Sequence, residues 1–167
     1  ISNISVNYLL NIYRNHIPKI SLTNSNKELL DYLKKEVYKI GLITDGRSIQ
    51  QRNKIKALGL SEYFDDIIIS EEFGSEKPNV NNYKYFIDKY GSSNIYAYIG
   101  DNTNKDFETP NALGWSTICL LDNGKNIHKQ SFSISKHKLP GFIINDLVEM
   151  KDLLFQIKNM KLKKATH

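Results

Sequence analysis

The sequence has little of several features that mark particular classes of protein. It contains one cysteine among its 167 residues, so it has no internal disulfide, as is typical of proteins from a reducing compartment. No apolar run approaches the roughly 18 residues that a membrane-spanning helix needs, and there is no signal-peptide pattern. These absences exclude a disulfide-stabilised scaffold, and they predict a cytoplasmic protein without a membrane partner.

Most of the formal net charge of +5 comes from the C-terminal residues, and the rest of the chain has little excess of positive charge. The last ten residues contain no acid and hold four lysines, which are Lys158, Lys161, Lys163 and Lys164. The remainder of the chain is close to neutral and lacks the clustered basic residues that nucleic-acid-binding domains use. We therefore expect a basic tail over residues 159–167 and no nucleic-acid partner.

The single cysteine, Cys119, lies in the apolar run 118–121, and no histidine is adjacent to it in the sequence. A reactive thiol needs a polar setting that stabilises its thiolate form. We interpret Cys119 as a small buried hydrophobic residue rather than a nucleophile.

Hydrophobic periodicity predicts that strands and helices alternate along most of the chain. The expected strands cover residues 38–44, 67–69, 95–99, 115–121 and 142–144, with one more short strand within residues 122–141. The expected helices cover residues 26–36, 47–58, 80–90 and 105–113, with a last helix after residue 146. This alternation is typical of an α/β fold with a doubly wound parallel sheet in a single domain.

Local signals indicate where several helices begin and end. Ser25-Asn-Lys-Glu28 has the spacing of a capping box, so we expect a helix to begin near residue 26. Residues 3–14 have apolar side chains at mixed spacing, and Pro18 would end any helix that they form. Gly59 and Gly91 are expected to end the two helices that precede them.

Polar residues suited to phosphate chemistry follow three of the expected strands. They are Thr44-Asp45-Gly46, Glu76-Lys77-Pro78, and Gly100-Asp101 with Asp106, and we expect Gly100 to let the backbone turn sharply. The carboxyl ends of parallel strands meet at one edge of a sheet, so the three groups can converge. A hydroxyl and backbone amides suit phosphate oxygens, an ammonium suits phosphate charge, and carboxylates suit a hard cation such as Mg²⁺.

Each of these residues also has a plain structural interpretation. Thr44 is then a hydroxyl at a strand end, and Lys77 is a surface lysine before a proline. Asp101 and Asp106 would cap the following helix, whose N-terminus favours acids. The order of the three groups, and the edge that they share, favour one common site.

The same motifs resemble those of the haloacid dehalogenase-like (HAD) hydrolases. Residues 42–46, 76–78 and 98–106 are similar to the second, third and fourth motifs of that superfamily, in the branch whose helical cap precedes the second motif. The resemblance extends from about residue 20 to 121, and residues 142–157 are similar to the last strand and helix of such domains. It implies a Rossmann-type core over residues 21–158, with the end of a helical cap over residues 1–20.

The resemblance also implies roles for the residues at the phosphate. Thr44 would bind the transferring phosphoryl group, and Lys77 would neutralise the nucleophile and the phosphate. Asp45 and Gly46 would contribute backbone contacts near the phosphate.

A metal site is implied by the same resemblance. Asp101 would hold Mg²⁺, and Asp106 would support the metal site or the water molecules bound to it. Asn102 would face the substrate. The implied cofactor is therefore Mg²⁺, and the implied partner is a small phosphorylated substrate.

One part of the family pattern is missing, because no strand ending in Asp-x-Asp-x-Thr precedes Thr44. In the family, the first Asp of that motif is the nucleophile and the second is the general acid and base. The strand that carries the motif lies in the middle of the family's sheet, so the strands ending at Thr44 and Gly100 would each lose a neighbour and expose apolar surface. Because Ile1 stands where a complete translation product has Met, we expect a segment outside these residues, or a second chain, to complete the sheet.

Together these observations predict a Mg²⁺-dependent hydrolase of phosphate monoesters that is active once the missing motif is supplied. A catalytically inactive HAD-like domain that binds a ligand or a protein is the alternative, since these residues include no nucleophile. A receiver domain of two-component signalling fits less well. In that fold the phosphoacceptor Asp comes before Thr and Lys comes last, whereas the order here is Thr44, Lys77, Asp101.

Overall fold

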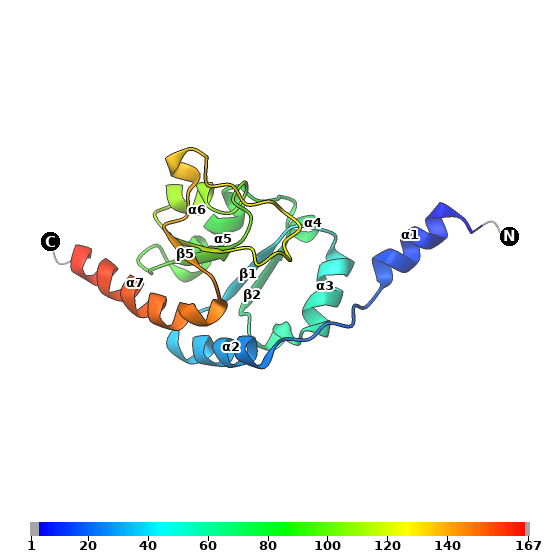
Figure 1. The fold of residues 1–167 in the computed structure, drawn as a ribbon, viewed down its shortest axis with the longest axis horizontal. Coiled ribbons are helices and arrows are strands. Elements are labelled where there is room, and N and C mark those ends of the chain that lie inside the picture. Colours follow the sequence, from blue (N-terminus) through cyan, green and yellow to red (C-terminus); the bar gives the residue numbers. More distant parts are fainter. Residues whose placement is uncertain (1–3, 166–167) are drawn as a thin grey trace. The chain divides into compact units, whose positions relative to one another are not determined.

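The computed structural model describes residues 4–165, and it describes the burial of side chains over residues 4–160. The chain forms two compact units, Ile1–Glu76 and Lys77–His167. Figure 1 shows the elements of both units along the ribbon, from α1 in blue to α7 in red. Among residues 4–165, no helix is both long enough and apolar enough to cross a bilayer.

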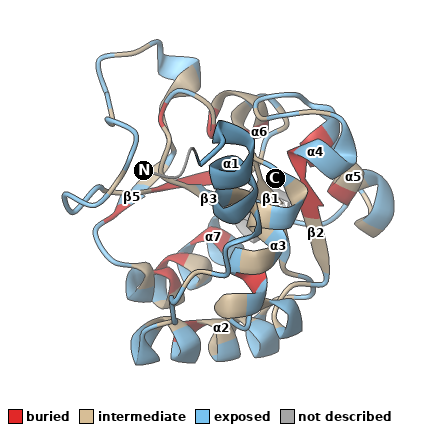
Figure 2. Ribbon diagram, turned by 90° about the vertical axis from the view of Figure 1, so that its right-hand side faces the viewer, coloured by how far each residue is buried: buried red, intermediate tan, exposed pale blue. Residues whose placement is uncertain are grey.

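The first unit contains two parallel strands and the helices around them. Its elements are α1 (Val6–Asn15), α2 (Asn24–Glu36), β1 (Gly41–Thr44), α3 (Ser48–Ala57), the 3-10 helix η1 (Leu60–Glu62), β2 (Asp66–Ile69) and α4 (Ser70–Phe73). β1 pairs with β2 in the register that places Thr44 opposite Ile69. Ile55, Ile68 and Ile69 are buried, whereas α1 has no buried residue (Figure 2).

α2 begins earlier than the sequence predicts, and the predicted capping box is wrong. Thr23 is the N-cap, because its backbone is extended and its Oγ1 accepts a hydrogen bond from the amide of Asn26 at 3.2 Å. Ser25 instead lies in the first turn of the helix, with its hydroxyl 3.0 Å from that of Thr23. The prediction for α3 is confirmed, since Gly59 follows it with a φ of +64°.

β1 is shorter than the strand predicted over residues 38–44. The amide of Ile40 donates to a side chain, the Oδ2 of Asp65, at 2.9 Å, and the Oδ1 of Asp65 lies 2.8 Å from the ammonium of Lys39. Tyr38 is 75% exposed. The carbonyl of Ile40 still accepts a hydrogen bond from the amide of Asp65 at 2.8 Å, but its amide pairs with a carboxylate, so the β1–β2 register begins only at Gly41.

The second unit contains three parallel strands in the order β3-β4-β5. Its elements are α5 (Asn81–Tyr90), β3 (Ala97–Gly100), α6 (Glu108–Ala112), β4 (Ser116–Leu120), η2 (Lys136–Lys138), β5 (Phe142–Ile144), η3 (Leu147–Glu149) and α7 (Met150–Ala165). The central strand β4 is buried over Ser116–Cys119. Cys119 is fully buried, which confirms its structural interpretation, and burial raises the pKa of its thiol to about 11.

One further prediction about this unit needs correction. No strand forms within the described residues 122–141, where the backbone follows a turn built on Asp122 and then η2. α7 continues to Ala165, so residues 159–165 of the predicted basic tail are helical backbone, and the tail itself stays a prediction. Residues 166–167 lie outside the described part of the chain.

Every strand is parallel to the neighbours with which it pairs, and helices separate most successive strands. The α/β fold class predicted from the sequence is therefore confirmed. β1 and β3 belong to different sheets, and among residues 4–165 no strand pairs with both of them. Each of these strands thus has one edge without a strand partner in the described chain.

Candidate active site

The centre of the candidate site in the second unit is the buried carboxylate of Asp106, whose side chain is 1% exposed. Its Oδ1 lies 2.7 Å from the ammonium of Lys77 and 3.4 Å from the hydroxyl of Tyr98. Its Oδ2 accepts hydrogen bonds from the amides of Asp101 at 3.1 Å and Asn102 at 2.9 Å. A buried charge is stable only when it is paired and hydrogen-bonded, and both oxygens of Asp106 meet this condition.

Gly100 provides the space that Asp106 occupies. A Cβ atom at residue 100 would lie 2.7 Å from the Cγ and 2.8 Å from the Cβ of Asp106, closer than real atoms of this kind approach. Gly100 is not among the glycines with positive φ, so its backbone conformation alone does not require glycine at this position. A glycine is needed because the side chain of Asp106 packs directly against the backbone.

Asp101 follows β3 directly and is half-buried. Its amide is held by Asp106, but no hydrogen bond or ion pair links its carboxylate to another described residue. Mg²⁺ takes oxygen ligands, usually one or two carboxylates with several water molecules. The carboxylate of Asp101 therefore fits a divalent cation, although residues 4–160 hold no group of three or more His, Cys, Asp or Glu side chains that could bind a metal ion.

The geometry separates the roles of the two acids for which the sequence suggests a metal site. Asp106 uses both carboxylate oxygens inside the protein, so it organises the loop that carries Asp101. The side-chain oxygen of Asn102 accepts a hydrogen bond from the amide of Asn104 at 3.0 Å. The expected contact between Asn102 and a substrate stays a prediction.

The first unit contains the predicted phosphate-binding residues Thr44, Asp45 and Gly46, at the end of β1. Gly46 has a φ of +136°, which favours glycine, and its amide donates to the Oγ of Ser70 at 2.9 Å. The carbonyl of Asp45 accepts a hydrogen bond from the Nε2 of Gln51 at 3.0 Å. A phosphate contact from the amide of Gly46 would thus replace the bond to Ser70.

Two acids of α4 hold the helix that follows this turn. The amide of Ser48 donates to the Oε2 of Glu71 at 2.7 Å, and its hydroxyl donates to Glu72. Arg52 donates to both oxygens of Glu72, from Nε at 2.9 Å and from Nη2 at 2.5 Å. The hydrogen bonds from Arg52 and Ser48 lower the pKa of Glu72 to about 2.

Sequence reasoning missed Tyr98, whose hydroxyl lies 3.3 Å from the ammonium of Lys77. Burial, followed by the charge of Asp106, raises the pKa of Tyr98 well above its ordinary value. The ring of Tyr98 packs edge-on against that of Tyr83, at 5.3 Å between centroids. A usable signal was present, because residues 98 and 100 point to the same face of a strand, and Gly100 leaves that face open for Asp106.

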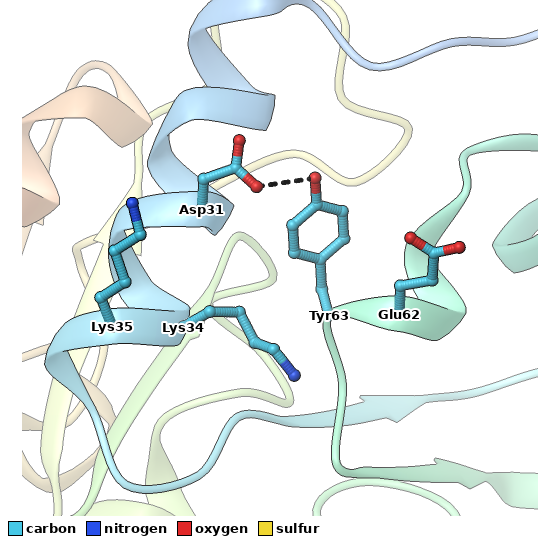
Figure 3. A pocket seen from close by; sticks show the side chains of 5 residues that line it. All are labelled: Asp31, Lys34, Lys35, Glu62 and Tyr63. Carbon is cyan, nitrogen blue, oxygen red and sulfur yellow. Dashed lines mark hydrogen bonds between the residues drawn. The ribbon is translucent and has the colours of Figure 1, made fainter.

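A separate surface hollow of about 360 Å³ lies in the first unit, between α2 and η1. Figure 3 shows its lining, which consists of Asp31, Lys34, Lys35, Glu62 and Tyr63. The hydroxyl of Tyr63 donates to Asp31 at 3.1 Å. Burial, together with this bond, raises the pKa of Tyr63. The lining combines acids and bases and includes none of the predicted site residues, so this hollow does not contribute to the candidate site.

Comparison with known proteins identifies the family. A family model for haloacid dehalogenase-like hydrolases matches residues 3–120. The chain is 35% identical over 125 residues to glyceraldehyde 3-phosphate phosphatase of Methanocaldococcus jannaschii, a match that covers 74% of this chain and 50% of that protein. It is 37% identical over 120 residues to a pyrimidine 5′-nucleotidase of Escherichia coli, covering 70% of this chain and 49% of that protein. The chain thus spans about half the length of these relatives.

Solved structures support the same fold. A HAD phosphatase from Thermococcus onnurineus matches with a TM-score of 0.67 and 23% identity, over 91% of this chain and 65% of that one. A dehalogenase in an intermediate complex matches with a TM-score of 0.64 and 19% identity, over 88% of this chain and 61% of that one. Together with the family match over most of its length, these similarities show that the chain belongs to the haloacid dehalogenase-like hydrolase family.

Proposed function

We propose that the protein containing this chain is a Mg²⁺-dependent phosphatase that hydrolyses a monoester of a small phosphorylated metabolite. The observation that carries the proposal is the arrangement on Asp106, which holds the ammonium of Lys77 and the backbone of Asp101 while the carboxylate of Asp101 makes no bond within the described chain. The names of the relatives, which include phosphatases of glyceraldehyde 3-phosphate, support the substrate class.

In this proposal the predicted site residues bind one phosphorylated substrate and one cation. The hydroxyl of Thr44 and the backbone of Asp45 and Gly46 bind phosphate oxygens, and the ammonium of Lys77 offsets the charge of the phosphate and the nucleophile. The carboxylate of Asp101 would hold Mg²⁺ together with water molecules. When bound, Mg²⁺ acts as a Lewis acid on phosphoryl oxygens and neutralises developing charge.

The nucleophile does not come from these residues, since they contain no Asp-x-Asp-x-Thr motif. We propose that a strand carrying this motif, in a segment outside these residues or in a second chain, pairs with β1 and β3. The edges of both strands that lack a partner among residues 4–165 support this arrangement. Unpaired edges expose backbone hydrogen-bonding groups that another strand satisfies.

Residues 1–20 are proposed to be the end of a helical cap, and the support comes from the apolar face of α1. Val6 and Tyr13 are each 71% exposed, Leu9 is 53% exposed and Leu10 is 38% exposed. Their spacing places all four side chains on one face of the helix. An exposed apolar face of this kind marks a surface on which further protein packs.

An assay of the gene-encoded protein that contains these residues tests the proposal. We expect it to hydrolyse p-nitrophenyl phosphate with Mg²⁺, to lose activity with a chelator, and to lose it with Asp101→Asn. Asp88→Asn, at an exposed position of α5, is the matched control and should retain activity.

Three outcomes would contradict parts of the proposal. Turnover by the isolated 167-residue chain would show that it contains its own nucleophile. Activity that survives both chelation and Asp101→Asn would exclude the metal role. A gene product that is inactive but binds a ligand or a protein would favour the alternative, a non-catalytic HAD-like domain.

A further inference from the structure

The segment that follows β4 folds back on itself through Asp122. The Oδ1 of Asp122 accepts hydrogen bonds from the amides of Gly124 at 2.8 Å, Lys125 at 3.0 Å and Asn126 at 2.9 Å. These bonds, with that from Asn126 the largest contribution, lower the pKa of Asp122. The chain is thereby reversed, and residues 130 and 131 return to the end of β3.

Gln130 joins this returning segment to Asp101. Its Nε2 donates to the backbone carbonyls of Asp101 and Leu120, each at 2.8 Å, and its Oε1 accepts a hydrogen bond from the amide of Asp122 at 3.0 Å. Next to it, the amide of Ser131 donates to the Oγ1 of Thr103 at 3.0 Å. All the hydrogen-bonding groups of the Gln130 amide group are directed at the ends of β3 and β4.

The backbone of Asp101 is consequently held on both sides of its Cα atom. Its amide donates to Asp106, and its carbonyl accepts from Gln130. Thr103, two residues further on, is 1% exposed and is held by Ser131. A fixed backbone sets the direction of the Cα–Cβ bond of Asp101. The position of its carboxylate, and of a cation bound to it, therefore depends on the groups that fix the backbone.

We propose that Gln130 is a positioning residue for the metal ligand Asp101, an inference that rests on the proposed function of Asp101. An amide side chain supplies both donors and an acceptor in one plane, which matches the two carbonyls and the amide that Gln130 meets. A methionine has similar length but offers no donor. Gln130→Met therefore releases the carbonyl of Asp101 while the carboxylate of Asp101 remains.

The test uses Mn²⁺ as the probe and the gene-encoded protein that contains these residues. Paramagnetic broadening of the amide signals of residues 100–102 is followed by NMR as Mn²⁺ is added. Groups that orient a metal ligand typically change affinity about 10-fold or more, so the Mn²⁺ concentration for half-maximal broadening should rise roughly 10-fold in Gln130→Met. Gln156→Met, at an exposed position of α7, is the matched control and should behave as the wild type.

A second control separates positioning from general destabilisation. Thr117 lies near the start of β4, where its hydroxyl donates to Asn111 at 2.7 Å and accepts from the amide of Gly141 at 2.9 Å, and neither bond involves the loop that carries Asp101. Thr117→Val should lower the urea midpoint of unfolding and leave Mn²⁺ binding unchanged. Should Gln130→Met not fold, Gln130→Asn, which keeps the amide but is shorter by a methylene group, is measured in its place.

The outcomes distinguish this inference from the proposed function. No broadening in the wild type, or equal broadening in Asp101→Asn, overturns the cation role of Asp101 and the positioning role with it. Broadening that Asp101→Asn abolishes but Gln130→Met leaves at the wild-type Mn²⁺ concentration overturns the positioning role alone. An equal loss of Mn²⁺ binding in Thr117→Val also overturns it, because destabilisation would then explain the effect.

Discussion

The carboxyl group of Asp106 lies in the space that a side chain at Gly100 would occupy. This contact places the carboxylate beneath the loop that begins at Asp101 and brings it within reach of Lys77. Gly100 and Asp106 therefore depend on each other. Asp106 supports the loop, and the absence of a side chain at Gly100 leaves the space that Asp106 needs.

Gly100→Ala should destabilise the protein. The added methyl group would lie 2.7 Å from the Cγ of Asp106, and overpacking of this kind costs about 1–3 kcal/mol in the free energy of unfolding. Gly141→Ala is the matched control, because its Cβ would meet its nearest neighbour, the carbonyl oxygen of Thr117, at an ordinary 3.5 Å. Urea unfolding measures both variants. Equal stability of the two would show that Asp106 moves aside without cost.

Asp106→Asn should lower the free energy of unfolding more than Lys77→Met does. The variant removes the buried charge opposite Lys77 and turns an amide nitrogen toward groups that are donors, and breaking a buried pair in this way costs about 3–5 kcal/mol. Lys77→Met leaves Asp106 with donors from Tyr98 and two backbone amides, so its cost should be smaller.

A double-mutant cycle of Lys77→Met and Asp106→Asn isolates the interaction between the two side chains. Residues in contact typically show a coupling energy of about 0.5–3 kcal/mol, and we expect the double variant to be more stable than the sum of the single losses predicts. Additive losses in urea unfolding would contradict the ion pair.

Glu72 should make the free energy of unfolding depend on pH between the pKa values of its unfolded and folded states. Its pKa is 4.5 in the ordinary case and about 2 in the folded chain, so its contribution is complete above pH 4.5 and is lost as the pH falls toward 2. Glu72→Gln should therefore differ from the wild type at neutral pH, and the difference should shrink as the pH falls below 4.5. Arg52→Gln removes the partner and should reduce the same slope. A difference in urea midpoint that does not change with pH would exclude this role.

Much of the architecture could be predicted because its signals are local. The period of apolar residues indicated the alternation of strands and helices, and the apolar run around Cys119 indicated its burial. Boundaries were less predictable where a distant side chain intervenes. Asp65 bonds to the amide of Ile40, which is 25 residues away in sequence, and so ends the strand pairing that the sequence suggests.

In the candidate site, too, local features could be predicted from the sequence and contacts between distant residues could not. The polar residues after each strand could be identified from the sequence, because strand ends and turn residues are local patterns. The commitment of Asp106 to structural bonds could not, because Lys77 lies 29 residues from it along the chain. The bond from Gln130 to Asp101 also spans 29 residues, within a segment whose composition indicates only a polar loop.

Our central proposal is that Thr44, Lys77 and Asp101 serve one phosphate and one cation. A crystal structure of the gene-encoded protein grown with Mg²⁺ and inorganic phosphate tests it most directly. We predict a phosphate in contact with the hydroxyl of Thr44 and the ammonium of Lys77, and Mg²⁺ bound to the carboxylate of Asp101. A phosphate bound away from Thr44 and Lys77, or Mg²⁺ bound without Asp101, would contradict the claim.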